Sequence, residues 1–476
     1  DLNMAFLIGG ANSAADTGFS VANSCRFNDG SSDDLTRTQD STNPTNGYKY
    51  SFSTWIKRGA LGAVMTLLGN YKAENEVGYI HFNANDFLEV YDFQGSGPDL
   101  NYTTDMKFKD ISSWYNIVVS VDGTRSANAR CKIYVNGSQV TCSSTVDTGG
   151  LLGIQYADAT NGLRIGSRGS SGGTIGYLDG YMAETIYIDG EGLAPTDFGE
   201  FNSDSPTIWQ PIDVSGLTFG NNGFYLDYED SSALGADVSG NSNNLTVNNL
   251  AATDQTTDTP TLNYMTLNPL AAGVGDVARI PTFSEGNTKF TAAGSNTFYQ
   301  AISTFGVAVG KWYFEVKVAS DQDLDKLRVG YWNIDKNVTS GEIQDVSAAN
   351  SHVFYMNKDG GEMRLNTSVT TADYGTFADN ELMGVAIDMD AQTITILKAN
   401  SVIVNAYDYS GGIAAGTVLT PAFMGYDDTA FQVNFGNPHE ANSSDAADGN
   451  GHGAFEFAPP SGYFAFNSSN LGKYGG

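Results

Sequence analysis

The sequence predicts an all-β protein made of two tandem β-sandwich domains, and three observations support this. A chain of 476 residues is long enough for two or three domains with substantial cores. Its 55 Gly, 25 Tyr and 26 Phe favour strands joined by tight turns. Apolar and polar residues alternate strictly along Gly310–Val318. Such alternation is typical of a half-buried antiparallel strand, whose core face would hold Trp312, Phe314, Val316 and Val318.

The charge of the chain restricts its partners. It has 24 Lys plus Arg against 54 Asp plus Glu, a formal net charge of −30. An excess of this size repels phosphate and argues against nucleic acid as a partner. No apolar run approaches the length of a membrane span, so we expect no membrane insertion. We interpret the charge as a solvated acidic surface.

The N-terminal half contains a first set of strand patterns separated by turn signals. Residues 222–250 follow this set with a strand at Phe224–Tyr228 and then a polar stretch. Repeated short strands of this kind indicate a β-sandwich. The patterns are Cys25–Thr38, Tyr50–Gly59, Trp114–Gly123, Cys131–Cys142, Leu163–Ser167 and Tyr177–Gly190.

The segment Cys131–Cys142 has the sharpest local pattern. Two β-rich runs surround Asn136-Gly137, the signature of a type I′ hairpin. Counting outward from this turn places Cys131 opposite Cys142 as a cross-strand pair, with Cα atoms about 5.5 Å apart. We therefore predict that these two thiols touch. The pattern is compatible both with a disulfide and with a contact between two small buried side chains. Cys25 has no evident partner in the sequence.

The second half repeats the pattern after a break in periodicity. Residues 253–261 carry no alternation and are interpreted as a linker. The predicted organisation is an N-terminal docking segment (1–17), a first sandwich with its connecting region (18–252), this linker, and a second sandwich (262–476). A frayed terminus is the alternative for residues 1–17. The further strand patterns of the second half are Leu327–Trp332, His352–Met356, Glu381–Asp390, Thr393–Asn400, Phe431–Gly436 and Pro459–Phe466.

These motifs carry two family resemblances. In the first half, CRFNDGSSDDL, FSTWIKRG, WYNIVVSVDG, KIYVNG and LDGYMAETIYID occur in order. Gly18–Asp189 resembles a laminin-G-like domain of the concanavalin A-like lectin/glucanase superfamily. In the second half, GKWYFEVKV, RVGYW, ELMGVAIDMDAQTITILKAN, FQVNFG and PPSGYFAF occur in the order of a SPRY domain, which Phe298–Phe466 resembles. Both resemblances imply jelly-roll sandwiches of antiparallel sheets.

The pairing of these domains, together with the opening FLIGGANS, resembles a virion surface protein of a tailed bacteriophage. The resemblance implies a tail fibre, spike or receptor-binding protein that recognises a host-surface glycan. It also implies a homo-oligomer, assembled in the host cytoplasm and exposed on the particle, whose N-terminal segment contacts other virion proteins. A capsid decoration protein or another structural virion protein is the alternative.

A glycan-degrading enzyme is the third hypothesis, and the sequence argues against it. Glycoside hydrolases need two carboxylates that flank the scissile bond. In the glucanases of this superfamily these lie on alternate positions of one strand. The nearest run here, Glu89-Val90-Tyr91-Asp92, has the wrong spacing, while Glu184 and Asp189 would face opposite sides of a strand. We therefore predict no catalytic residues and no required cofactor.

Candidate binding residues lie in predicted loops. Glycan sites combine exposed aromatic side chains with polar groups, and the candidates are Tyr156, Arg168, Tyr374 and Tyr426. Calcium is the one metal that the sequence suggests, because laminin-G-like domains sometimes bind it at the sandwich rim and it prefers oxygen ligands. Its candidate ligands are Asp237, Asn241 and Asn243. A turn that caps its own backbone is the alternative.

Overall fold

The structure is a computed structural model. It describes residues 7–8, 18–39, 44–95, 97–149, 152, 154, 162–271, 279–294, 296–320, 326–336, 342–346, 348–357, 360–370 and 372–475. The chain divides into two compact units: Ala14–Thr261, and Leu262–Gly476 together with Asp1–Ser13. The described part is almost entirely strand and loop, with one α-helix, α1 (Ser468–Tyr474). None of its helices is long and apolar enough to cross a membrane. Short 3-10 helices lie at Pro195–Asp197, Ala252–Asp254 and Ile343–Asp345.

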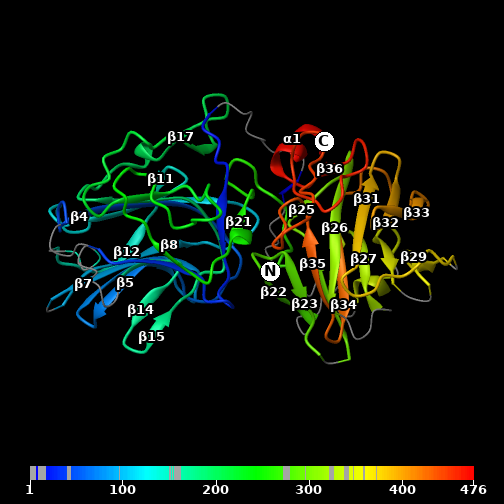
Figure 1. The fold of residues 1–476 in the computed structure, drawn as a ribbon, viewed down its shortest axis with the longest axis horizontal. Coiled ribbons are helices and arrows are strands. Elements are labelled where there is room, and N and C mark those ends of the chain that lie inside the picture. The colour runs from blue at the N-terminus through cyan, green and yellow to red at the C-terminus, as the bar shows by residue number, and fades with distance from the viewer. Residues whose placement is uncertain are drawn as a thin grey trace. The chain divides into compact units, whose positions relative to one another are not determined.

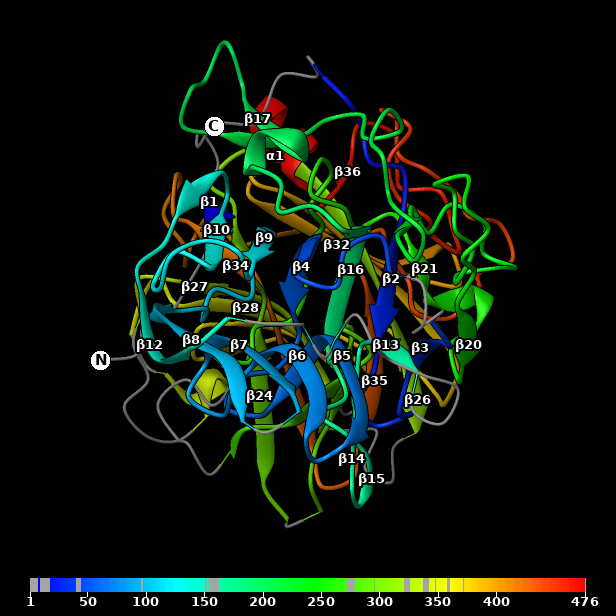
Figure 2. The ribbon, with the colours of Figure 1, turned by 90° about the vertical axis from the view of Figure 1, so that its left-hand side faces the viewer.

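The first unit is a sandwich of two antiparallel sheets, which we name after β4 and β7 (Figures 1 and 2). In spatial order, the β4 sheet contains β11 (Ser138–Gln139), β10 (Cys131–Val135), β9 (Tyr115–Asp122), β4 (Lys49–Arg58), β16 (Gly180–Asp189), β2 (Ser24–Phe27) and β21 (Gln255–Thr256), with β19 (Phe224–Leu226) also paired to β16. The β7 sheet contains β12 (Cys142–Asp147), β8 (Pro98–Lys107), β7 (Phe87–Gln94), β6 (Glu76–Phe82), β5 (Met65–Ala73), β13 (Leu163–Ile165), β3 (Asp34–Arg37) and β20 (Thr246–Asn248).

The core of the first unit lies between these two sheets. On β4, alternate residues such as Phe52 and Ile56 enter this core, as the two-residue period of a strand requires. The other face of β4 is also covered, because Trp55 packs in a second cluster with Trp209 of β18 (Trp209–Pro211). β18 pairs with β17 (Gly199–Phe201) in a separate hairpin. The β4 sheet is therefore buried on both faces.

The structure shows that the predicted hairpin ends before Cys142. The Asn136-Gly137 turn forms as expected, with Val135 opposite Ser138. After Val140, however, the chain leaves the hairpin and joins the other sheet, where Cys142 pairs with Thr104 of β8. On its other side, Cys131 pairs with Val121 of β9. The strand pairing of Cys131 with Cys142 is therefore not formed, and both cysteines are free thiols. Cys142 still packs against the core cluster that contains Cys131, and the contact of the two thiols stays a prediction.

The predicted linker is part of the first unit. Gln255–Thr256 forms β21, which pairs with β2. Two residues later, the Asp258 carboxylate lies 2.7 Å from Lys57 Nζ in an ion pair of which neither side chain is more than 1% exposed. The indole N–H of Trp114 donates to the same carboxylate at 3.1 Å. The polar composition of this stretch reflects buried hydrogen bonding, so the interpretation as a linker is wrong.

The second unit is also a sandwich, of the β26 and β27 sheets. The β26 sheet contains β22 (Thr282–Ser284), β23 (Lys289–Thr291), β35 (Ala430–Asn434), β26 (Lys311–Ser320), β31 (Leu382–Asp388), β32 (Thr393–Lys398) and β33 (Ser401–Asp408), with β36 (Phe464–Ala465) paired to β26. The β27 sheet contains β24 (Phe298–Ile302), β34 (Leu419–Tyr426), β27 (Arg328–Asn333), β28 (His352–Met356), β29 (Glu362–Leu365) and β30 (Ser368–Val369).

The strand β26 alternates as predicted, but it is not half-buried. Phe314 and Val316 lie in the core between the sheets. On the opposite face, Tyr313 packs against Phe455, and Glu315 is only 1% exposed. The segment that follows β35, residues 435–475, therefore covers part of the outer face of this sheet, and we call it the C-terminal segment.

The N-terminal residues that the structure describes belong to the second unit. β1 (Leu7–Ile8) pairs in parallel with β25 (Phe305–Gly306). Within the segment predicted to dock, residues 7–8 therefore pair with the chain's own second unit. The rest of that segment lies outside the described residues.

Candidate functional site

The predicted loop aromatics do not form one site. Tyr156 lies outside the described residues. Tyr374 is partly buried against the core of the second unit. Tyr426 ends β34, where the ring of Phe298 meets it edge-on at 5.1 Å and Lys326 Nζ lies 3.7 Å from its centroid. Arg168, the fourth candidate, belongs to a larger cluster of interacting side chains.

Arg168 belongs to a stacked group on the outer face of the β7 sheet. It lies on β14 (Arg168–Ser170), which forms a hairpin with β15 (Gly173–Ile175) beside β5 (Figure 2). Its guanidinium carbon lies 4.5 Å from the ring centroid of Tyr79. The Tyr79 ring also stacks on Tyr91 at 5.0 Å with an interplanar angle of 14°, and on His81 at 4.4 Å. We call Arg168, Tyr79, Tyr91, His81 and Glu89 the tyrosine platform.

Strand periodicity explains how the platform arises. Ile80, Leu88 and Val90 enter the core, so the alternate residues of β6 and β7 face outward. Tyr79 pairs directly with Tyr91 across the two strands, and directly opposed side chains on one face are close enough to stack. Tyr79, Tyr91 and His81 were not among the sequence candidates, which were sought in loops. The alternation within YIHF and FLEVYDF was the available signal.

Gly69 allows Arg168 to reach the platform. This residue of β5 lies opposite Tyr79. A Cβ atom at Gly69 would lie 2.6 Å from the Cβ of Arg168 and 3.2 Å from the backbone oxygen of Ser167, so a larger residue would push the β14 hairpin away. The hairpin therefore depends on glycine at this position.

Glu89 supplies the negative charge of the platform. Its carboxylate accepts a hydrogen bond from the Tyr79 hydroxyl at 3.3 Å and lies 3.6 Å from His81 Nε2. The interaction with His81 is the main cause that lowers the pKa of Glu89, although burial opposes it. Burial, followed by the charge of Glu89, raises the pKa of Tyr79, so this hydroxyl keeps its proton. The platform thus places the partly exposed ring of Tyr91 beside a carboxylate and a guanidinium group.

The other carboxylate of the Glu89–Asp92 run does not join the platform. Asp92 is fully buried, and it accepts a hydrogen bond from the backbone N–H of Ile154. The two carboxylates therefore belong to opposite faces of β7, as their odd spacing requires.

The structure brings the predicted calcium ligands together in one turn, where they hydrogen-bond to their own surroundings. The Asp237 carboxylate accepts backbone N–H bonds from Tyr225, Ser239 and Asn243 at 2.7–2.9 Å. The side-chain amides of Asn241 and Asn243 both donate to the Gly223 carbonyl. This pattern favours the self-capping alternative. Among the described residues, no three His, Cys, Asp or Glu side chains group at metal-binding distance.

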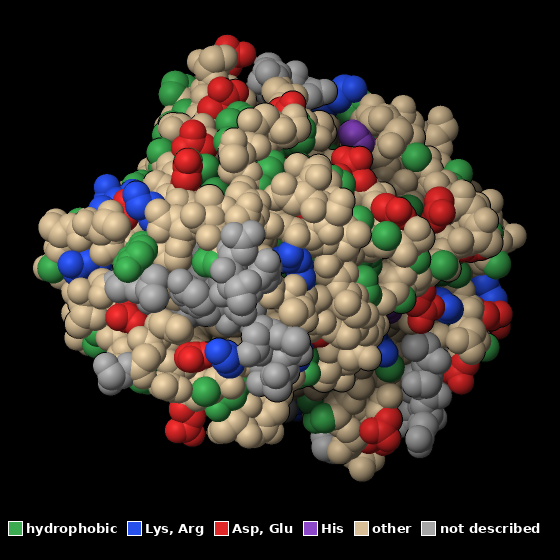
Figure 3. Space-filling view, turned by 60° about the vertical axis from the view of Figure 1, so that its left-hand side comes forward, with side chains coloured by type: hydrophobic (Ala, Val, Ile, Leu, Met, Phe, Trp, Pro, Cys, Tyr) green, Lys and Arg blue, Asp and Glu red, His purple; other side chains and the backbone are tan. Residues whose placement is uncertain are grey.

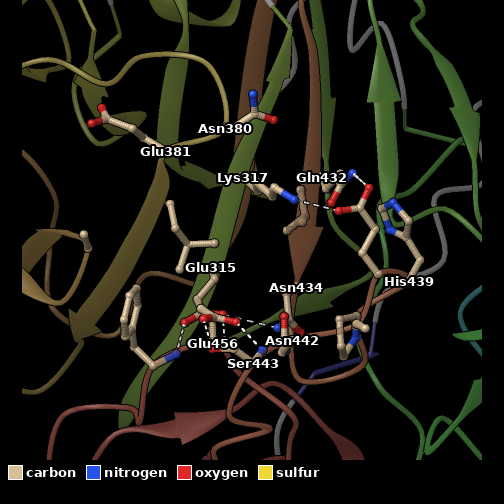
Figure 4. Close-up of a pocket in the computed structure, with 17 residues that line it drawn as sticks. Glu315, Lys317, Asn380, Glu381, Gln432, Asn434, His439, Asn442, Ser443 and Glu456 are labelled. Carbon is tan, nitrogen blue, oxygen red and sulfur yellow. Dashed lines mark hydrogen bonds and ion pairs between the residues drawn. The ribbon is translucent and has the colours of Figure 1, made fainter.

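A pocket of about 500 Å³ opens over the outer face of the β26 sheet (Figure 4). Glu315 and Lys317 of β26 lie beside Gln432 and Asn434 of β35, and residues 438–443 and 456–457 enclose them. Lys317 pairs with Glu440 at 2.7 Å. The pocket is therefore lined by charged and amide side chains on strands and by the C-terminal segment.

Glu315 is held tightly at one end of this pocket. Its carboxylate accepts backbone N–H bonds from Glu456 and Phe457, both at 2.9 Å. The Tyr313 hydroxyl and the Asn434 amide donate to it at 3.1 and 3.3 Å. Burial raises its pKa to about 6, against the lowering effect of these hydrogen bonds. Four donors occupy the four acceptor positions of a carboxylate.

Comparison with known protein families assigns both sandwiches. Residues 29–190 match the concanavalin A-like lectin/glucanases superfamily, and residues 311–438 match the SPRY domain family. The chain joins a concanavalin A-like domain to a SPRY domain. The tyrosine platform lies on the concanavalin A-like domain, and the pocket lies on the SPRY domain and its C-terminal segment. No curated protein matches the sequence.

Several solved structures are similar to parts of the chain. The SPRY domain of human HERC1 has 15% identity and a TM-score of 0.27, and the match covers 35% of this chain and 96% of that one. The TRIM65 PSpry domain has 11% identity and a TM-score of 0.29, with coverages of 36% and 89%. A putative carbohydrate binding protein from Bacteroides ovatus has 17% identity and a TM-score of 0.34. That match covers 48% of this chain and 59% of that protein.

Proposed function

We propose that this protein binds carbohydrate through the tyrosine platform. The observation that supports the proposal is the outward stack of Tyr79, Tyr91 and Arg168 beside the Glu89 carboxylate. Sugars present apolar C–H faces that pack on aromatic rings and hydroxyl groups that hydrogen-bond to carboxylates and guanidinium groups. The platform offers both kinds of contact on a sheet, which is a more rigid support than a loop.

We further propose that the glycan lies on a host surface and that the protein is a tail fibre, spike or receptor-binding protein of a tailed phage. The resemblance of the domain pair to such proteins supports this placement. An acidic surface suits a soluble, externally exposed protein, and Figure 3 displays acidic side chains scattered over the visible face with basic ones among them. A capsid decoration protein is the alternative placement on the particle.

The proposed role is non-enzymatic. A glycosidase needs two carboxylates on either side of one bond, separated by about 5–10 Å. The platform has one, Glu89, because Asp92 belongs to the opposite face of the strand. In the SPRY pocket, Glu315 is engaged by four donors of the protein itself. These arrangements suit binding and structural support.

The proposal is tested by a glycan array and host-cell binding with the full chain and the variant Tyr91→Ala. We expect saturable binding that free sugar competes, weakened at least about tenfold by the loss of one aromatic face. Tyr48→Ala is the matched control, because Tyr48 is an exposed tyrosine of the same unit outside the platform. Equal loss in both variants, or unchanged binding by Tyr91→Ala, would contradict the platform assignment.

The same assay distinguishes the remaining alternatives. Loss of binding on addition of a calcium chelator would identify a calcium requirement and make Asp237, Asn241 and Asn243 the first residues to replace. Absence of glycan binding, combined with tight retention on particles that lack tails, would support the capsid decoration role instead.

A further inference from the structure

The pocket over the β26 sheet contains two carboxylates that form no ion pair among the described residues, although the more distant charge of Lys317 contributes to lowering the pKa of one of them, Glu456. Four glutamates line it, and two of them are paired: Glu440 with Lys317 at 2.7 Å, and Glu381 with Lys398 at 2.6 Å. Among the described residues, no ammonium or guanidinium group lies within 4.0 Å of the other two, Glu315 and Glu456. Figure 4 shows these two carboxylates at the same end of the pocket.

The burial of Glu315 makes its lack of an ion-pair partner informative. A carboxylate that is 1% exposed loses most of its hydration, and a buried charge normally has a counter-charge or a metal. Among the residues that the structure describes, the groups that hydrogen-bond to it are neutral donors: two backbone N–H groups, a hydroxyl and an amide. A cation in the adjoining pocket would supply the missing counter-charge.

Glu456 is the carboxylate that can contact such a cation. The backbone N–H of Ser443 donates to one of its oxygens at 2.7 Å, and the Ser443 hydroxyl donates to the other. Because an ionised carboxylate has about four acceptor positions, two remain for a ligand. The hydrogen bonds from Ser443 also lower the pKa of Glu456, so it is ionised at neutral pH.

The rest of the pocket has an apolar part. Leu382 and Ala399 come from β31 and the turn after β32, Pro438 and Ala441 come from the loop after β35, and Phe457 lies beside Glu456. An apolar wall next to an anionic end suits a ligand with a hydrocarbon body and a cationic head. The body would contact the apolar wall, and the cation would contact the carboxylates.

We propose that this pocket binds an organic cation, whose ammonium or guanidinium group pairs with Glu456 near Glu315 and whose apolar body packs on Leu382 and Phe457. Amino sugars and the basic side chains of proteins both carry this chemistry. The inference goes beyond the glycan proposal and does not rest on it, because the pocket belongs to the second unit and shares no residue with the tyrosine platform.

The experiment measures binding of two pairs of probes to the full chain by titration calorimetry. Nα-acetyl-lysine amide is compared with Nα-acetyl-norleucine amide, and glucosamine with N-acetylglucosamine; in each pair only the first probe is cationic. We expect at least one cationic probe to bind at least tenfold more tightly than its neutral counterpart. Preference for the lysine derivative would indicate a protein partner, and preference for glucosamine would indicate an amino sugar.

Three variants locate the binding. Glu456→Gln should weaken binding of the cationic probe at least tenfold, because it removes the negative charge. It keeps a side-chain oxygen that can accept a hydrogen bond from Ser443. Ala441→Trp should block the pocket without a change of charge. Glu362→Gln, on β29 of the other sheet, should bind as the wild type does. Equal affinity for cationic and neutral probes, no binding of any probe at millimolar concentration, or full binding by Glu456→Gln would overturn the proposal.

Discussion

Glu184 is a buried carboxylic acid in a central strand. It has a positive φ of 50° and lies at a β-bulge of β16, where the pairing with β4 shifts register. Burial raises its pKa from 4.5 to about 8, and the charges of Asp227, Glu229 and Asp213 add to this effect, while a hydrogen bond from the Tyr225 hydroxyl opposes it. Glu184 is therefore protonated in the folded unit at neutral pH.

This shift predicts how pH affects the concanavalin A-like unit. The folded state binds the proton of Glu184 more tightly than the unfolded state does, so stability from this group is full below about pH 4.5 and is lost as pH rises through about 8. Glu184→Gln should flatten this dependence. It should be more stable than the wild type at pH 8.5 by a few kcal/mol, since one pKa unit corresponds to about 1.4 kcal/mol.

Denaturant unfolding of both proteins at pH 5 and pH 8.5 measures the effect. Parallel pH profiles for the two proteins would mean that Glu184 is already ionised in the folded state.

Gly69 is a second residue whose replacement should affect the concanavalin A-like unit. Gly69→Ala should displace the β14 hairpin, because its new Cβ would lie 2.6 Å from that of Arg168. We expect a loss of about 1–3 kcal/mol in stability and weaker glycan binding. Gly97→Ala is the control, since a Cβ there meets nothing within 4 Å. Unchanged glycan affinity in Gly69→Ala would show that Arg168 is not needed for binding.

At the scale of elements, the buried ion pair of Lys57 and Asp258 holds β21 and the end of the first unit in place. Removal of one partner leaves a buried charge without compensation, so Lys57→Ala should cost about 3–5 kcal/mol. The exposed pair of Lys72 and Glu76 provides the comparison, and Lys72→Ala should cost less than about 1 kcal/mol. Hydrogen exchange in β2 and β21 should rise only in Lys57→Ala; equal protection in both variants would contradict this role.

The same elements show what the sequence could predict. The sequence predicts strands such as β26 and β4 because apolar residues recur at every second position along them. The linker prediction at 253–261 failed because polar residues look alike whether water or a buried partner such as Lys57 satisfies them. The end of the Asn136-Gly137 hairpin was not predicted, because no local signal marks the point after Val140 where the chain changes sheets. Of the platform, only Arg168 was named as a binding candidate, since outward-facing aromatics on strands resemble core residues when neighbouring sheets are unknown.

At the scale of the whole molecule, the net charge of −30 should control stability and solubility. Repulsion among like charges destabilises compact states and is screened by salt over a Debye length of about 10 Å at 0.1 M. The midpoint of thermal unfolding should therefore rise between 10 and about 300 mM sodium chloride. Glycerol at matched osmolality controls for general solvent effects. A midpoint that falls with salt would mean that attractive ion pairs outweigh the repulsion.

The pairing of β1 with β25 has a consequence for how the chain is assembled from modules. Asp1–Ser13 groups with Leu262–Gly476, while Ala14–Thr261 forms a unit of its own. The concanavalin A-like unit is thus an insertion between the first strand of the SPRY unit and the rest of it. Its first and last strands, β2 and β21, are hydrogen-bonded neighbours, so the two ends of the inserted unit lie side by side within that unit. We therefore expect that another domain with adjacent ends could replace the concanavalin A-like unit while both parts of the host remain in one chain.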